Sequence, residues 1–175
     1  MHTYIDKIIS SRERLTWLGR MSRTPEMLGD GFDPEELSFV HPSIAITCWE
    51  GAAQVVGQPG YYVINVAEEL NTPCDVKIPV NPRDGVSATR SQLDRIAGVV
   101  AQQLEGPDDT RIIVHCAMGV ERSALAVAWF LRSWLGYGSL TAAYDAISAV
   151  RPIVADRSGW AGEELDVPIP GVEVA

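Results

Sequence analysis

The sequence has few residues that could form disulfides or bind metal ions. Its 175 residues include only three cysteines, Cys48, Cys74 and Cys116, and three histidines. The cysteines are widely spaced without a Cys-x-x-Cys pair, and the histidines do not cluster. These patterns argue against a disulfide framework and against a structural zinc site. We therefore expect no metal and no cofactor.

Long hydrophobic runs and positive charge are also scarce. The longest apolar stretch, around residues 124–131, is too short to span a bilayer. Residues 1–7 lack the apolar stretch of a signal peptide, so we expect a cytoplasmic protein. The formal net charge is −9 and the isoelectric point is about 4.7. This acidity disfavours nucleic acid and anionic membranes as partners.

What the sequence does contain is the pattern of one α/β domain. Hydrophobic residues make up 46% and charged residues 21%, as in globular proteins. Short β-prone segments alternate with helical ones, which predicts a short, mostly parallel central sheet flanked by helices. We expect Thr89 and Gln92 to form a capping box and Ser139 to cap a later helix. The expected strands are 43–47, 61–66, 76–80 and 111–114, and the expected helices are 50–56, 88–104, 123–135 and 139–150.

One segment, residues 115–123, joins a buried-type strand to an apolar helix through a tight loop. Ligands of open α/β sheets bind at the carboxyl ends of strands, and amides before a helix N-terminus form an anion site. Gly119 would let the loop turn sharply. We expect this loop to bind phosphate through Ala117, Met118, Gly119, Val120, Glu121 and Arg122.

Cys116 opens this loop and is the candidate nucleophile. The helix N-terminus and Arg122 both favour a thiolate, and the arginine fork matches two phosphate oxygens. A lone cysteine is usually an inert small hydrophobe, which is our interpretation of Cys48 and Cys74. Around Cys116 the preceding strand, the glycine, the arginine and the following helix all fit a phosphate-binding loop. This consistency favours a catalytic cysteine over an inert one.

Three further loop residues carry weaker signals. His115 is expected to hold the loop's shape by a hydrogen bond to backbone, although a histidine in the core is the alternative. Ser123 could cap the helix or stabilise the Cys116 thiolate as it leaves. For Glu121 we expect a side chain pointing to solvent; the alternative is that its carboxylate selects against highly charged substrates.

The string from His115 through Cys116 to Arg122 and Ser123 resembles the signature of the cysteine-dependent protein tyrosine phosphatases, and is most similar to the dual-specificity branch. The resemblance covers about residues 43–163. It implies a cysteinyl-phosphate intermediate that water hydrolyses, with no metal. Flanking segments that resemble the same branch are 63–70, 77–80, 142–144 and 150–154.

The resemblance also implies an aspartate that protonates the leaving oxygen. Asp84, in the loop after residue 80, is our candidate. A plain turn aspartate is the alternative, and Asp75 is the second choice for the acid. The family often has Pro-Asn where this chain has Asp156 and Arg157. The resemblance therefore does not extend to the contact that this pair makes in support of the active site.

These observations predict a phosphomonoester hydrolase, most plainly a protein tyrosine or dual-specificity phosphatase acting on phosphotyrosine and also on phosphoserine or phosphothreonine. One alternative is a phosphatase of a non-protein ester, such as a phosphoglucan, a phosphoinositide or an RNA 5′-phosphate. Another is a catalytically weak module that binds phosphoproteins. We expect residues 1–42 to form a helix and an irregular extension packed on the domain, 43–167 the catalytic domain, and 168–175 a loose tail.

Overall fold

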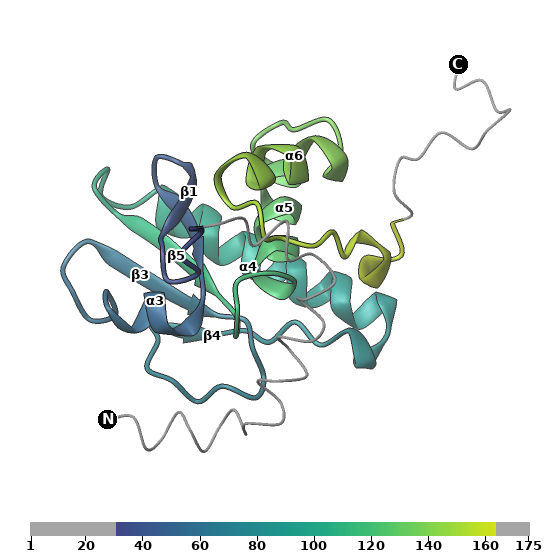
Figure 1. The fold of residues 1–175 in the computed structure, drawn as a ribbon. Coiled ribbons are helices and arrows are strands. Elements are labelled where there is room, and N and C mark those ends of the chain that lie inside the picture. The colour runs from purple at the N-terminus through teal and green to yellow at the C-terminus, as the bar shows by residue number, and fades with distance from the viewer. Residues whose placement is uncertain (1–30, 164–175) are drawn as a thin grey trace, which may run out of the picture.

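A computed structural model describes residues 31–163 of the chain. The helix expected at the N-terminal end of residues 1–42 and the tail expected at 168–175 lie outside these described residues. Five strands form a single sheet in the order β1-β2-β5-β3-β4 (Figure 1). Their bounds are β1 Ser38–His41, β2 Ile44–Thr47, β3 Tyr61–Asn65, β4 Val76–Lys77 and β5 Arg111–His115.

The sheet is mostly parallel, which confirms the expected architecture. The central strand β5 pairs in parallel with β2 on one side and with β3 on the other, and β4 adds in parallel to β3. The edge strand β1 runs antiparallel to β2. The carboxyl ends of β2, β3 and β5 therefore meet at one edge of the sheet.

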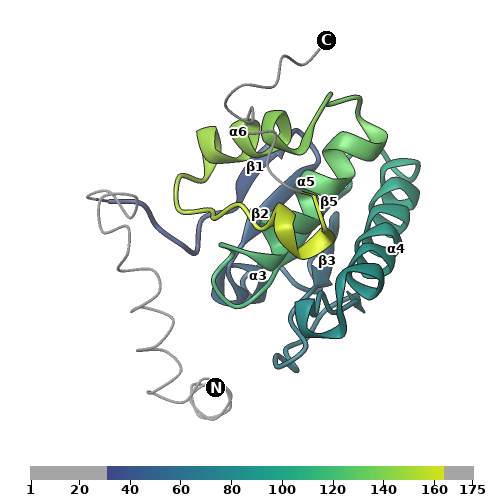
Figure 2. The same cartoon turned by 90° about the vertical axis from the view of Figure 1, so that its right-hand side faces the viewer.

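Helices cover the two faces of the sheet unequally (Figures 1 and 2). The long helices α4 and α5 pack on one face, and α6 packs against α5, whereas the short α3 lies against the other face. No helix in the described range 31–163 is long and apolar enough to cross a membrane. The helices are α3 Trp49–Ala53, η1 Pro82–Asp84, α4 Val86–Leu104, α5 Arg122–Trp134, α6 Leu140–Val150 and η2 Ser158–Ala161.

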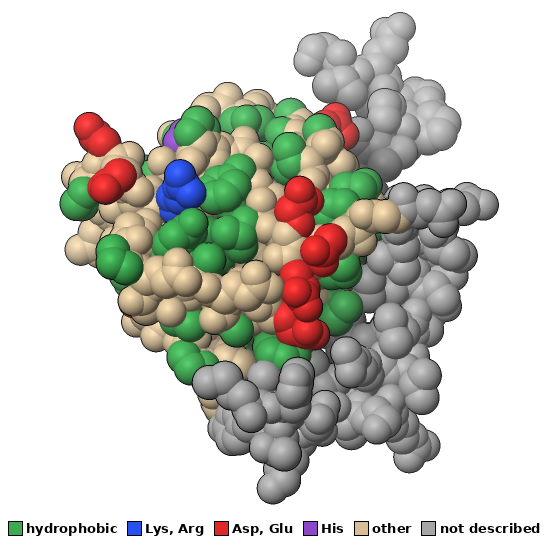
Figure 3. Space-filling view, turned by 60° about the vertical axis from the view of Figure 1, so that its left-hand side comes forward, with side chains coloured by type: hydrophobic (Ala, Val, Ile, Leu, Met, Phe, Trp, Pro, Cys, Tyr) green, Lys and Arg blue, Asp and Glu red, His purple; other side chains and the backbone are tan. Residues whose placement is uncertain are grey.

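Both faces of the central strand are buried, which explains its unbroken apolar sequence. Ile112 and Val114 face the core beneath α4 and α5, whereas Ile113 joins Ala45 and Val63 beneath α3. Since α3 is short, apolar side chains beside it are only partly buried. Figure 3 shows hydrophobic side chains gathered on one face of the molecule, with acidic side chains along its margin.

Two local expectations are wrong. Residues 38–41 were expected to be irregular, but they form β1, because Ser38 pairs with Ile46 across the sheet. Helix α4 begins at Val86 rather than near Thr89, and no capping box forms. The Thr89 hydroxyl instead donates to the Gly85 carbonyl within the helix. The Ser139 cap is confirmed, since its hydroxyl accepts from the amide of Ala142 at 3.0 Å.

Candidate active site

The loop of residues 116–121 leaves the sheet at its centre. Strand β5 ends at His115, which pairs with Thr47 of β2 and Asn65 of β3. Helix α5 begins at Arg122. The loop is therefore held between two neighbouring strands and a helix N-terminus, where backbone amides favour an anion.

Every backbone carbonyl of this loop accepts a hydrogen bond from a group outside the loop. His115 Nδ1 lies 3.0 Å from the Cys116 oxygen, and the Trp49 amide donates to the Ala117 oxygen at 3.1 Å. The remaining acceptors are the carbonyls of Met118 and Gly119, bonded by Arg151, that of Val120, bonded by the Ala155 amide, and that of Glu121, bonded by the Leu125 amide. With every carbonyl bonded, the amides are the backbone groups of this loop that could bind an anion, as in an anion-binding nest.

Arg151 is the main organiser of this loop, a role that the sequence analysis did not predict. Its side chain is fully buried. The guanidinium donates to the Gly119 carbonyl at 2.7 Å and to the Met118 carbonyl at 3.0 Å. It also donates to the carbonyls of Pro34 and Glu36 and to the Ser38 hydroxyl, so it joins the loop to the segment before β1.

Gly119 takes the backbone conformation that the sharp turn requires, with φ of +66°. A Cβ at this position would lie 2.6 Å from the Arg151 guanidinium and 2.6 Å from the Thr47 carbonyl oxygen. Both the positive φ and the lack of space therefore require glycine.

Cys116 lies at the start of the loop, fully buried. Burial, the largest single influence, raises the pKa of the Cys116 thiol, but the groups around it together lower that pKa from its ordinary value, with the Arg122 charge first among them. The Ser123 hydroxyl, 3.2 Å from the sulfur, and the backbone amides of Ser123 and Gly119 lower the pKa further. The arrangement favours a thiolate nucleophile.

The surroundings of His115 favour a neutral ring with its proton on Nδ1. Burial lowers its pKa, and the Arg122 charge lowers it further, so the ring is neutral. Because Nδ1 faces the Cys116 carbonyl, the proton sits on Nδ1. Nε2 is buried and has no hydrogen-bond partner among the described residues. These contacts suit a part in holding the loop's shape.

Arg122 forms an ion pair with Glu69, a residue that the sequence analysis did not name as part of the site. Nη1 donates to Oε2 at 2.6 Å and Nη2 to Oε1 at 2.5 Å, a bidentate pair. Burial alone would raise the pKa of Glu69, but its bonds to Arg122 lower it, so the carboxylate stays ionised. The buried Asn65 shapes the loop that carries Glu69, since it donates to the Leu70 carbonyl and accepts from the Ala67 amide.

Glu121 does not point to solvent, so that expectation is wrong. Its side chain is 11% exposed and accepts from Arg157 Nε at 3.2 Å and Nη2 at 2.6 Å, both at Oε1. The exposure rule fails here because an arginine from beyond α6 reaches the carboxylate and compensates its burial.

Asp84 lies in η1, exposed, at the same edge of the sheet as the loop. The chain before it runs along β3, with the amides of Ile78 and Val80 bonded to the carbonyls of Asn65 and Val66. The Asp84 carboxylate accepts from Gln92 at 3.0 Å.

The second candidate acid lies earlier on the sheet. The Asp75 carboxylate accepts from the Val63 amide at 2.7 Å, two residues before the end of β3. That bond holds the carboxylate beside β3 rather than beside the loop. Within residues 31–163 no group of three or more His, Cys, Asp or Glu side chains could hold a metal ion.

No protein-family model matches the sequence, and no curated protein matches it. Solved structures do match. Human DUSP28 aligns over 75% of this chain and 90% of its own, with 19% identity and a TM-score of 0.60. DUSP15 aligns over 72% of this chain and 83% of its own, with 22% identity and a TM-score of 0.56.

The chain has the dual-specificity phosphatase fold. A leucine rich repeat and phosphatase domain containing protein from Entamoeba histolytica shares it at 12% identity, over 73% of this chain and 87% of that one, with a TM-score of 0.58. At such identities the likeness concerns the fold. In this chain the 116–121 loop follows the carboxyl end of the central strand β5 and leads into helix α5.

Proposed function

We propose that this protein hydrolyses phosphate monoesters of phosphoproteins through a cysteinyl-phosphate on Cys116. The observation that carries the proposal is the loop of residues 116–121, whose carbonyls are all bonded outward around a thiol of lowered pKa. Such a loop suits the three equatorial oxygens of a phosphoryl group in transfer, with Arg122 as a charged partner.

In the first step the Cys116 thiolate attacks phosphorus, and an S–P bond forms as the P–O bond to the leaving group breaks. The loop amides and Arg122 stabilise the charge on the equatorial oxygens. Asp84 gives its proton to the leaving oxygen. Glu69 is a poor donor for this role, because its bonds to Arg122 keep its carboxylate ionised.

In the second step water attacks phosphorus and the S–P bond breaks, which releases inorganic phosphate. Asp84, now a carboxylate, takes a proton from the water. The Ser123 hydroxyl, 3.2 Å from the Cys116 sulfur, donates to the returning thiolate and so stabilises the leaving group. The chain supplies every group in this cycle, so no metal enters it.

Phosphotyrosine is the substrate that the surroundings favour. Met118 and Val120 of the loop pack with Phe32, Ile153 and Ala155 in an apolar cluster. An apolar border suits an aromatic leaving group better than a sugar phosphate. The carboxylates of residues 69 and 84 stand at the same edge of the sheet and would repel polyphosphoinositides and RNA.

The proposal is tested by hydrolysis of p-nitrophenyl phosphate in the presence of EDTA. We expect Cys116→Ser to abolish turnover and Cys48→Ser, which alters another buried cysteine, to leave it intact. We expect Asp84→Asn to lower kcat by roughly 10²–10⁴-fold, the usual contribution of a general acid. Asp75→Asn is the matched control and should keep nearly full activity.

Peptides carrying phosphotyrosine, phosphoserine or phosphothreonine then define the substrate class. Turnover of the phosphotyrosine peptide, with less of the other two, supports the proposal. A wild-type protein that binds phosphopeptides without turning over any ester would instead be a phosphoprotein-binding module, and the proposed activity would be wrong.

A further inference from the structure

A buried carboxylate beside a phosphate site needs an explanation. Glu121 directly precedes Arg122 in the loop, and its side chain is only 11% exposed. An uncompensated negative charge here would weaken binding of a phosphate dianion, because it would act on the neighbouring arginine that binds the anion and would repel the anion itself. The chain nevertheless keeps a glutamate at this position.

The compensating charge comes from Arg157. Its guanidinium donates twice to Glu121 Oε1, at 3.2 and 2.6 Å, and lies over the Trp160 ring at 5.5 Å. Its backbone amide donates to the Tyr144 hydroxyl at 3.2 Å. Arg157 is therefore held by helix α6, by η2 and by the loop at once.

The same segment also touches the loop through its backbone. The Ala155 amide donates to the Val120 carbonyl at 2.9 Å, one residue before Glu121. The Arg157 side chain is 41% exposed whereas that of Glu121 is 11% exposed, so the ion pair joins a buried carboxylate to an arginine that reaches the surface. This location lets the pair influence an anion in the loop as well as the loop's shape.

We propose that Arg157 is a positioning and specificity-determining residue, which neutralises Glu121 and thereby sets the affinity of the loop for a phosphate dianion. The proposal rests on the proposed function for the identity of the anion. The two side chains act as one unit of zero net charge. Removing the arginine alone leaves a bare carboxylate beside the phosphate, whereas removing both charges does not.

The test is a double-mutant cycle with inorganic phosphate as the probe, measured by calorimetry at low salt so that no turnover is needed. The variants are Arg157→Gln, Glu121→Gln and the two combined. We expect Arg157→Gln to weaken phosphate binding roughly tenfold, the size of one nearby unscreened charge. The double variant should bind within about twofold of wild type, since both charges are gone.

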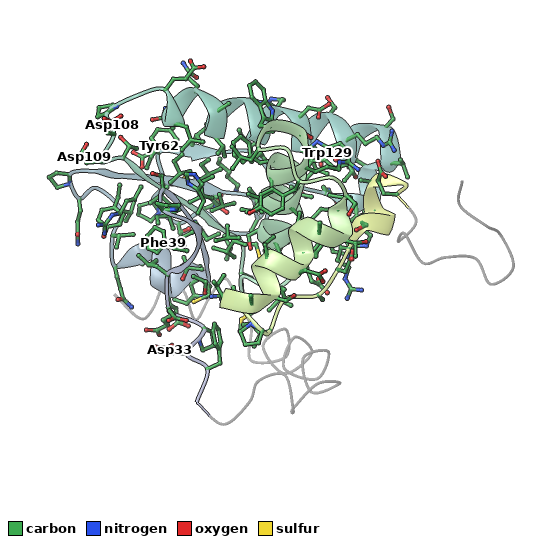
Figure 4. The ribbon with its side chains drawn as sticks, turned by 90° about the horizontal axis from the view of Figure 1, so that it is seen from above. Asp33, Phe39, Tyr62, Asp108, Asp109 and Trp129 are labelled. Carbon is green, nitrogen blue, oxygen red and sulfur yellow. The ribbon has the colours of Figure 1, made fainter. Side chains whose placement is uncertain are left out.

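The matched control is Arg111→Gln. It removes an exposed arginine of equal charge from the far end of β5, beside the loop that carries Asp108 and Asp109 (Figure 4). This control should leave phosphate binding unchanged. In turnover assays Arg157→Gln should raise KM more than it lowers kcat, because the lost interaction acts on the bound dianion.

Equal weakening in Arg157→Gln and in the double variant would overturn the proposal, since Arg157 would then act only by supporting the loop. Unchanged phosphate binding in Arg157→Gln would also overturn it. If that variant does not fold, Glu121→Gln decides alone: equal or tighter phosphate binding supports the proposal, and weaker binding refutes it. A wild-type protein that neither binds phosphate nor turns over esters would instead refute the proposed function itself.

Discussion

Replacing Arg151 by methionine should disorder the phosphate loop. It should also remove much of the domain's free energy of unfolding. Methionine has a similar length and no donors, so the change isolates the hydrogen bonds of the guanidinium. These bonds reach five acceptors: the carbonyls of Gly119, Met118, Pro34 and Glu36, and the Ser38 hydroxyl. All five acceptors lose a charged donor at once.

The magnitude follows from opposing terms. A hydrogen bond from a charged donor contributes about 1.5–3 kcal/mol, so five contribute roughly 7–15 kcal/mol before any offset. Burying the guanidinium costs several kcal/mol of desolvation, and the methionine variant avoids this cost, which offsets part of the loss. The net loss in the free energy of unfolding is then about 5 kcal/mol, close to the whole stability of a marginal domain at about 5–15 kcal/mol.

Urea denaturation followed by tryptophan fluorescence measures this loss. With a slope of about 2 kcal/mol per molar, the midpoint of Arg151→Met should fall by about 2–3 M. Arg151→Lys keeps the charge but not the fork, and should fall between the two proteins. Arg111→Met, an exposed change at the opposite end of β5, should lose less than about 1 kcal/mol. A loss below about 1 kcal/mol in Arg151→Met would refute the reasoning.

Two further predictions concern the reacting groups. Ser123→Ala removes a hydrogen bond that lowers the pKa of Cys116, so this pKa should rise. The acidic limb of the kcat/KM profile should therefore move to higher pH. An unchanged limb in a full pH profile would contradict this role. Glu69→Gln loosens the grip on Arg122 and should lower kcat/KM about tenfold, whereas a fall in KM without loss of kcat would show that Glu69 competes with phosphate instead.

The sequence predicts the centre of this fold better than its edge. Strand β5, the loop and α5 carry strong local signals: an unbroken apolar strand, a glycine at a sharp turn and an apolar helix. Strand β1 carries no such signal, because its four residues become a strand only by pairing with β2. The start of α4 was misplaced because Thr89 and Gln92 fit a capping pattern yet bond elsewhere.

The site shows the same limit. Cys116, Arg122 and Ser123 lie close together in sequence, so their spacing alone predicts a common site. Glu69 lies 53 residues from Arg122, and no local pattern marks a carboxylate that will meet an arginine so distant. Arg157 compensates Glu121 across 36 residues, which is why an exposure rule for single residues gave the wrong orientation. Such pairings depend on tertiary structure.

The contacts of Arg151 also determine when the site can form. They join residues near position 34 to residues near 118, separations of 117 and 33 positions from the arginine itself. During synthesis we therefore expect the loop to reach its final shape only after Arg151, which follows α6, has left the ribosome. Contacts of such high sequence separation form slowly. Cys116 should thus become reactive only when the segment after α6 docks onto the loop. An incompletely synthesised chain would then carry an unreactive cysteine.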